Sequence, residues 1–174
     1  MPIIRKATLK DALIISTLAE YTFRQTFRQD FIYAHELDTY CDETFNYSKI
    51  KKAIIKKENQ FFVAVVDEEI VAYAKMKKDK PKVVELQKIY LHHAFHRQGL
   101  GLLLMNASIA EAKVLGYDTM WLKVVENNVK AIAFYKQLGF AFTKLHHHPI
   151  GSNPFVFHQM DLSLKNIDVS NHKS

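Results

Sequence analysis

The chain contains the hexapeptide His96-Arg97-Gln98-Gly99-Leu100-Gly101, placed between an apolar run of strand type, Val83–Leu91, and a helix that begins at the glycines. Glycines let a backbone approach a ligand closely, and the first N–H groups of a helix have no intrahelical partner. With the positive end of the helix dipole and the charge of Arg97, these donors favour a phosphate or pyrophosphate. A plain tight turn fits the same pattern. The hexapeptide lacks the third glycine of a dinucleotide-fold fingerprint and the Gly-Lys-Ser/Thr of a P-loop.

Strand-type and helix-type segments continue in both directions from this loop. Before the loop, hydrophobic periodicity and turn signals predict a strand at Ile3–Lys6, helices from Thr8 to about Phe27 and over Ser48–Lys57, and a hairpin of Phe61–Val66 and Ile70–Lys75. After it, they predict a helix, a strand at Thr119–Val125, a helix at Asn128–Leu138, and strands at about Phe140–His147 and Phe155–Leu162. Hairpins and crossovers together predict an α/β (α+β) fold with a mixed sheet and helices on its faces.

Two segments are harder to interpret. In the helix after the glycines, we expect one apolar face made of Leu103, Ala107, Ala110 and Val114. The stretch from Asp30 to Asn46 is acidic and aromatic and has no clean period. It fits a solvated loop, and its carboxylates at Glu36–Glu43 could also receive a polycation.

Composition limits the class of protein. The 174 residues are 48% hydrophobic and 24% charged, which excludes a disordered or collagen-like chain. A single cysteine, Cys41, excludes an internal disulfide and fits a reducing, cytoplasmic compartment. No apolar run approaches the roughly 20 residues that span a bilayer. We expect one domain over residues 1–164 and a polar, frayed tail over 165–174.

The formal net charge of +6 is spread along the chain. It fits a solvated basic surface or an anionic small-molecule ligand. No nucleic-acid-binding motif accompanies it, so neither nucleic acid nor a membrane is an expected partner.

A second motif follows the loop. Asn128 is followed seven residues later by Tyr135 on one helix, and Gly139-Phe140 closes that helix. A tyrosine beside Phe134 on a helix face is usually part of the core. The order of strand, glycine loop, helix, strand, Asn-x6-Tyr and Gly-Phe nevertheless resembles the GCN5-related N-acetyltransferases over about sixty residues. This resemblance implies a mostly antiparallel sheet of about seven strands with about four helices.

The likeness extends over most of Ile3–Leu164. The segments Leu86–Tyr90, Trp121–Val124, Ala131–Tyr135 and Met160–Leu162 are similar to the PaiA subgroup, bacterial spermidine/spermine N-acetyltransferases. The subgroup implies a polyamine or another small primary amine as acceptor. The net positive charge of the chain opposes a polycation at long range, although a local acidic pocket could override it.

The resemblance also implies a role for individual residues toward acetyl-CoA. Backbone groups of three strand residues would pair with the pantetheine arm: Ile89, Tyr90 and Leu91. The pyrophosphate would be held by the main-chain N–H groups of Arg97, Gln98, Gly99, Leu100, Gly101 and Leu102. Asn128, at the start of the next helix, would contact the pantetheine. Tyr135 would lie near the thioester sulfur as general acid. His96 departs from the family, which usually has Gln or Arg at this position.

The implied chemistry is direct attack of an amine on the thioester, with no metal and no covalent intermediate. An amine with a pKa of about 10.4 must lose a proton first. Glu85, on the strand before the loop, is the first candidate for the base, and His92 and His93 are the others. Strand N–H groups would stabilise the oxyanion.

Several residues and alternatives stay open. His146-His147-His148 with His158 could hold a metal, although neighbouring strand residues point to opposite faces, or one of them could lie near the acceptor. Cys41 is not expected to be a nucleophile, and Trp121 is expected in the core. The activity could instead be acetylation of a protein N-terminus or lysine, or binding of acetyl-CoA by a regulatory protein without turnover. Dimers are common in the family, and the sequence leaves the oligomeric state open.

Overall fold

A seven-stranded sheet with the order β1-β2-β3-β4-β5-β7-β6 organises the chain in the computed structural model, which describes residues 1–165 and 167. The strands are β1 (Ile3–Lys6), β2 (Asn59–Val66), β3 (Glu69–Lys80), β4 (Val83–Leu91), β5 (Thr119–Val125), β6 (Ala141–Ile150) and β7 (Asn153–Ser163). Among the strand pairs of the described residues, only β4–β5 is parallel. The predicted mixed, mostly antiparallel sheet is therefore confirmed. Most of the tail expected over 165–174 lies outside the described residues.

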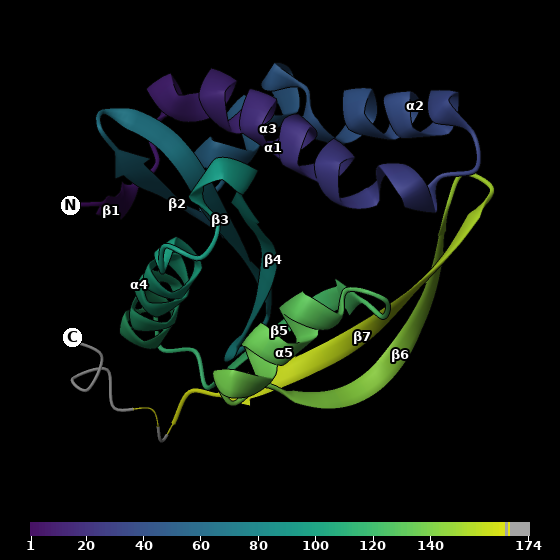
Figure 1. Ribbon diagram of the computed structural model, residues 1–174. Coiled ribbons are helices and arrows are strands. Elements are labelled where there is room, and N and C mark those ends of the chain that lie inside the picture. The colour runs from purple at the N-terminus through teal and green to yellow at the C-terminus, as the bar shows by residue number, and fades with distance from the viewer. Residues whose placement is uncertain (166, 168–174) are drawn as a thin grey trace.

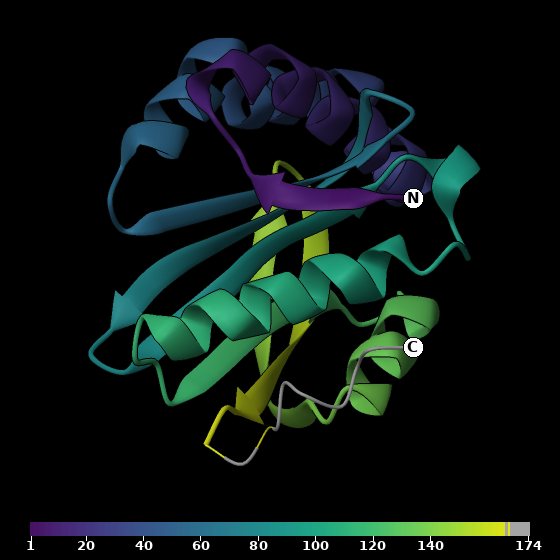
Figure 2. The same cartoon turned by 90° about the vertical axis from the view of Figure 1, so that its left-hand side faces the viewer.

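The helices form two layers, one on each face of the sheet (Figures 1 and 2). They are α1 (Ala12–Phe27), α2 (Ala34–Phe45), α3 (Tyr47–Ile55), α4 (Leu100–Val114) and α5 (Val129–Gln137). Helices α1–α3 pack on one face around a core that includes Ile15, Phe23 and Tyr73. Helices α4 and α5 pack on the other face around a core that includes Leu104 and Met105. The central strands are thus covered on both sides, as a crossover between parallel strands requires, whereas β1 and β6 are mostly exposed.

Helix α2 replaces the loop considered for Asp30–Asn46, and that interpretation is wrong over Ala34–Phe45. Its buried residues Leu37, Cys41 and Phe45 recur every four positions, which places them on one helical stripe. The acidic residues between them occupy the other faces. The segment is therefore an amphipathic helix with a narrow apolar stripe.

The apolar face expected for α4 is also wrong. Val114 is 80% exposed and Leu103 is 37% exposed, whereas Leu100, Leu104 and Ile109 are buried. This helix carries apolar residues nearly all round its first two turns, so periodicity alone does not identify the buried side.

Trp121 likewise lies outside both cores. Its ring is half-buried on β5, and its indole N–H donates to Asp79 at 3.1 Å. No helix of the described part of the chain is long and apolar enough to cross a bilayer.

Candidate active site

The two parallel strands part soon after they meet. They pair only at Val83↔Thr119, Val84↔Met120 and Glu85↔Trp121. Beyond that point β4 continues to Leu91 and β5 to Val125 without a ladder between them. Backbone N–H and C=O groups on the two facing edges are left for another partner. An extended ligand could add itself there like a strand.

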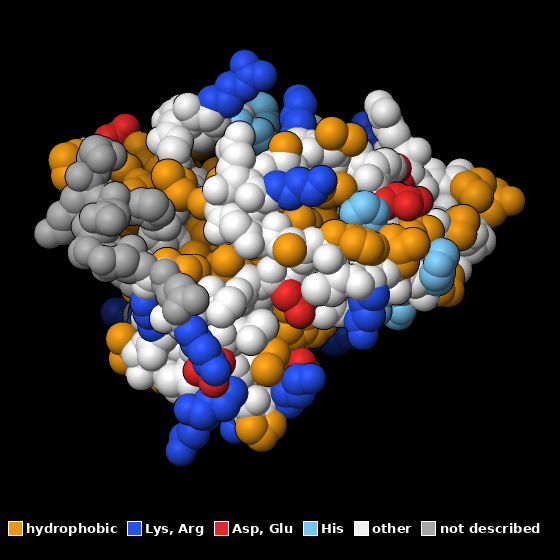
Figure 3. Space-filling view, turned by 90° about the horizontal axis from the view of Figure 1, so that it is seen from below, with side chains coloured by type: hydrophobic (Ala, Val, Ile, Leu, Met, Phe, Trp, Pro, Cys, Tyr) orange, Lys and Arg blue, Asp and Glu red, His pale blue; other side chains and the backbone are white. Residues whose placement is uncertain are grey.

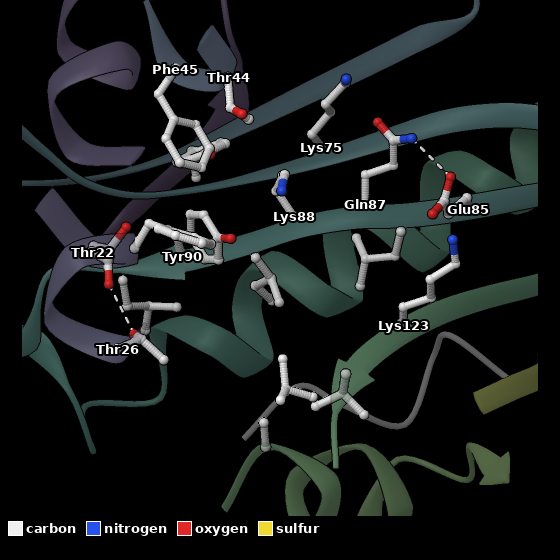
Figure 4. A pocket seen from close by; sticks show the side chains of 18 of the residues that line it. Thr22, Thr26, Thr44, Phe45, Lys75, Glu85, Gln87, Lys88, Tyr90 and Lys123 are labelled. Carbon is white, nitrogen blue, oxygen red and sulfur yellow. Dashed lines mark hydrogen bonds between the residues drawn. The ribbon is translucent and has the colours of Figure 1, made fainter. Parts of the chain in front are cut away.

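A cleft with a volume of about 1230 Å³ lies between the parted strands and the elements around them (Figure 4). Its walls come from both strands, from the start of α4, from α5, from α1–α3, and from the adjoining ends of β6 and β7. Of the residues expected at the site, those that line it are Glu85, Ile89, Tyr90, Leu91, Arg97, Gly99, Gly101, Leu102, Asn128 and Tyr135. Gln98 and Leu100 do not: Leu100 is 2% exposed in the core, and the Gln98 amide donates to the Ala94 carbonyl at 3.3 Å.

The glycine loop turns sharply into α4. Gly99 has φ +77°, a conformation that costs glycine little and other residues more. Arg97 has φ +62° without being a glycine, which is a strained arrangement of the kind found at functional sites. The first intrahelical bond runs from the Leu103 N–H to the Gly99 carbonyl at 3.1 Å. The N–H groups of the preceding residues therefore have no carbonyl of their own helix to bind.

His96, the residue that departs from the family, acts within the loop. Its Nε2 lies 3.2 Å from the Leu91 carbonyl oxygen, so it ties the loop to the end of β4. Asn128 caps α5 in a comparable way, because its Oδ1 accepts from the Ala131 N–H at 3.3 Å.

Tyr135 lies on α5 and is 8% exposed. Its ring packs against Phe134 and Phe140, with centroids 5.4 and 5.8 Å away. Burial raises the pKa of the Tyr135 hydroxyl, and nearby Tyr90 adds to the shift. The hydroxyl is therefore a neutral proton donor at physiological pH.

Glu85 stands where the two strands part, and its Oε2 accepts from the Gln87 amide at 2.8 Å. The β3–β4 register skips Gln87, which marks a β-bulge two residues after the last position at which β4 pairs with β5. His92 and His93, the other candidates for the base, do not line the cleft. They pack instead on Tyr21: the His92 ring stacks at 4.7 Å, and His93 Nδ1 lies 2.5 Å from the Tyr21 hydroxyl.

The acidic stretch lies mostly outside the cleft. The Glu36 carboxylate accepts from the Ser152 N–H, the Ser152 hydroxyl and the Asn153 amide, at 2.8–2.9 Å. These bonds lower the pKa of Glu36. Asp38 pairs with Arg24 at 2.6 Å. Neither carboxylate is directed at a ligand in the cleft.

The histidine run lies on β6, where His146 Nε2 is 2.8 Å from the Gln159 side-chain oxygen and His148 lines the cleft. Among residues 1–165 and 167 there is no group of three or more His, Cys, Asp or Glu side chains placed to hold a metal. Cys41 is buried in α2, and burial raises the pKa of its thiol to about 11.

Three lysines that the sequence did not single out also line the cleft. Lys75 on β3 lies directly opposite Lys88 on β4, and Lys123 projects from β5 (Figure 4). Burial, together with the charges of Lys88 and Lys77, lowers the pKa of Lys75 to about 8. The sequence predicts the two strands that carry Lys75 and Lys88. It does not predict the register of their pairing, and it is this register that places the two lysines opposite each other.

The profile of the acetyltransferase (GNAT) family matches residues 20–140. An uncharacterised N-acetyltransferase of Lactobacillus delbrueckii subsp. lactis is 27% identical over 137 residues, which cover 75% of this chain and 79% of that protein. The ribosomal protein bS18-alanine N-acetyltransferase of Escherichia coli K12 is 46% identical over 46 residues, 26% of this chain and 31% of that protein. The chain belongs to the GNAT family and is an acetyltransferase.

Among solved structures, the PaiA N-acetyltransferase of Thermoplasma acidophilum in complex with coenzyme A has a TM-score of 0.78, at 20% identity over 94% of this chain and 99% of that one. At this identity the likeness shows the shared fold. It confirms the predicted fold class and leaves the subgroup as a proposal.

Proposed function

We propose that the protein transfers the acetyl group of acetyl-CoA to the primary amine of a small molecule, by direct attack in a ternary complex. The observation that carries this proposal is the parting of β4 and β5 after Glu85↔Trp121, beside a helix start with unpaired N–H groups. An extended amide-containing chain fits the parted edges, and a pyrophosphate fits the helix start. Both belong to acetyl-CoA.

On this proposal the cofactor half of the cleft acts through backbone groups. Ile89, Tyr90 and Leu91 pair with the pantetheine arm, and Asn128 contacts it from the start of α5. The N–H groups of the loop, Arg97–Leu102, hold the pyrophosphate, and the Arg97 side chain adds a positive charge. Burial of Leu100 and the inward bond of Gln98 do not oppose this role, because it is the main chain that donates.

The transfer itself needs two proton movements. The ammonium loses one proton to Glu85, directly or through water, and its nitrogen then forms a bond to the thioester carbonyl carbon. As the C–S bond breaks, that nitrogen gives up a second proton, which the leaving sulfur takes up. Tyr135 stabilises the leaving sulfur by donating its hydrogen bond. Because the pKa of the buried phenol lies above that of a thiol, about 8.5, the ammonium is the net source of the proton that the thiol gains.

The names of two similar proteins suggest two classes of acceptor amine. The fold likeness to PaiA supports a polyamine, and the short match to the bS18-alanine enzyme supports a peptide N-terminus. Two features of the described residues weigh against a polyamine: Glu36 is occupied by its bonds to the β6–β7 turn, and lysines line the cleft.

The first test is release of CoA thiol from acetyl-CoA with a panel of amines, together with calorimetric titration of acetyl-CoA. Tyr135→Phe should bind acetyl-CoA as the parent does and turn over at least tenfold more slowly. Tyr117→Phe is the matched control, because Tyr117 is half-buried and does not line the cleft. Binding without turnover on any amine would indicate a regulatory acetyl-CoA-binding protein, and absence of binding would refute the proposal.

A further inference from the structure

The charge of the cleft is strongly unbalanced. In the part of the chain that the structure describes, nine lysine or arginine side chains line it, and only two carboxylates, those of Glu58 and Glu85. The phosphates of a CoA-type ligand account for the cations near the glycine loop. They do not account for Lys75 and Lys88, because Lys88 lies three residues before the end of β4, about 10 Å along the strand.

Lys75 and Lys88 occupy an unfavourable arrangement. They are direct cross-strand partners on β3 and β4, where like charges destabilise a sheet. Both are half-buried, and within residues 1–165 and 167 neither forms an ion pair with a carboxylate. The Lys75 ammonium lies 5.7 Å from the Phe61 ring centroid, and that of Lys88 lies 5.4 Å from Phe45. Aromatic faces hold the two cations in place without neutralising them.

Lys123 extends the group across the opening. It projects from β5 two residues beyond the last paired position, Trp121, and its ammonium lies 5.4 Å from that indole ring. The lysine cluster, Lys75, Lys88 and Lys123, therefore lines, together with Glu85, the space in which the proposed reaction takes place (Figure 4). A dication or polycation entering this space would be repelled by it.

We propose that the acceptor is an amine that also carries an anionic group, a carboxylate or a phosphate, and that Lys75 and Lys88 bind this group. The inference rests on the proposed acetyl transfer and names the class of its acceptor. An anion between the two ammonium groups removes their mutual repulsion and forms charge-assisted hydrogen bonds. It also fixes the distance from the anion to the amine, which places the amine near Glu85.

The test uses acceptors that share an amine and differ in charge. For a carboxylate, 4-aminobutanoate is compared with 1-aminobutane and 1,4-diaminobutane; for a phosphate, O-phosphoethanolamine is compared with ethanolamine. A tripeptide with a free N-terminal amine, a C-terminal alaninamide and no charged side chain represents a peptide N-terminus. We expect kcat/KM to be at least tenfold higher for one anionic member than for its neutral partner, and lowest for the diamine. The pair that responds identifies the anion.

Variants connect the preference to the two lysines. Lys75→Met and Lys88→Met should each lower kcat/KM for the anionic acceptor by 10–100-fold through KM, with no change in the KM for acetyl-CoA. The ratio of kcat/KM for the anionic acceptor to kcat/KM for the partner without the anionic group should fall at least tenfold in each variant. Lys78→Met is the matched control, because Lys78 is a β3 lysine that does not line the cleft. Circular dichroism and thermal unfolding verify that each variant is folded.

The outcomes separate the two proposals. Turnover that favours the diamine, the neutral amines or the peptide overturns the anionic acceptor and leaves acetyl transfer standing. An increase in the KM for acetyl-CoA in Lys75→Met or Lys88→Met also overturns it, since the lysines would then bind the cofactor. If no amine releases CoA from a protein that binds acetyl-CoA, the acetyl-transfer proposal fails, and the acceptor inference fails with it.

Discussion

Replacing Lys75 with methionine should stabilise the unliganded protein at neutral pH. The ammonium is half-buried, lies opposite Lys88, and has no carboxylate partner among the described residues. Methionine keeps the length of the side chain and its contact with Phe61 while removing the charge. The substitution therefore removes an unfavourable charge and little packing.

The magnitude follows from the pKa. Burial, with a smaller effect of Lys88, lowers the pKa of Lys75 from 10.5 to about 8. At about 1.4 kcal/mol per pKa unit, this corresponds to about 3 kcal/mol. Solvent reaches part of the side chain, so screening reduces the expected gain to about 1–3 kcal/mol. A gain of this size is a large fraction of the stability of a small domain.

The effect has a characteristic pH dependence. Below pH 8 the lysine is protonated in both the folded and the unfolded state, so the folded protein carries the full penalty. Between pH 8 and 10.5 the unfolded state binds more protons, and the stability of the parent rises with pH. The advantage of Lys75→Met should therefore shrink to less than about 1 kcal/mol by pH 10.

Urea unfolding of the parent, Lys75→Met and the control Lys78→Met, at half-unit steps from pH 7 to 10, measures this difference. Lys78→Met should differ from the parent by an amount that does not change with pH. A Lys75→Met protein that is less stable than the parent at pH 7, or a gain that persists unchanged to pH 10, would refute the reasoning. Either result would mean that the Lys75 ammonium is solvated.

Three further predictions follow from single contacts. Tyr135→Phe should lower kcat at least tenfold and leave acetyl-CoA binding unchanged, as measured by thiol release and calorimetry. Asp11→Asn should lower the free energy of unfolding by about 2 kcal/mol at pH 7, because the hydrogen bonds from Arg5 lower the pKa of Asp11 from 3.8 to about 2. In urea unfolding, this difference between the variant and the parent should vanish as the pH falls from about 4 to 2. Gly151→Ala should destabilise by about 1–3 kcal/mol in thermal unfolding, because φ is +58° and the new Cβ would lie 2.8 Å from the Glu36 carboxyl carbon.

The parts of the fold that local chemistry specifies could be predicted from the sequence. Gly99 stands where φ is +77°, and the alternation of apolar runs around it gave the strands of the hairpin and the crossover. Helix α2 was missed because its stripe is only Leu37, Cys41 and Phe45, with acidic and aromatic residues between them. The face of α4 was misassigned for the opposite reason: too many of its residues are apolar. Periodicity discriminates only when apolar and polar positions are both present in number.

The part of the candidate site that depends on backbone conformation, the glycine loop, could be predicted from the sequence. The part that depends on the register of paired strands, the lysine cluster, could not. A glycine loop before a helix marks a set of free N–H donors whatever the surrounding side chains are. The lysine cluster has no such local mark. Lys75 and Lys88 are thirteen positions apart, and a shift of one residue in the β3–β4 pairing would place them on opposite faces. The skipped residue Gln87 is what sets that register, and a bulge leaves no pattern in the sequence.

The same distinction explains why a shared fold need not imply a shared acceptor. On the proposed function, the cofactor half of the cleft would act through N–H and C=O groups of β4 and of the start of α4, which any sequence with this backbone supplies. The remaining half is lined by side chains on β3, β5, α1–α3, β6 and β7. A structure 20% identical to this chain can therefore keep the first half while differing at most positions of the second. Substrate class has to be argued from the acceptor side chains themselves. Here the charged side chains among them are mainly cationic, which supports the proposed amine with an anionic group over a polyamine.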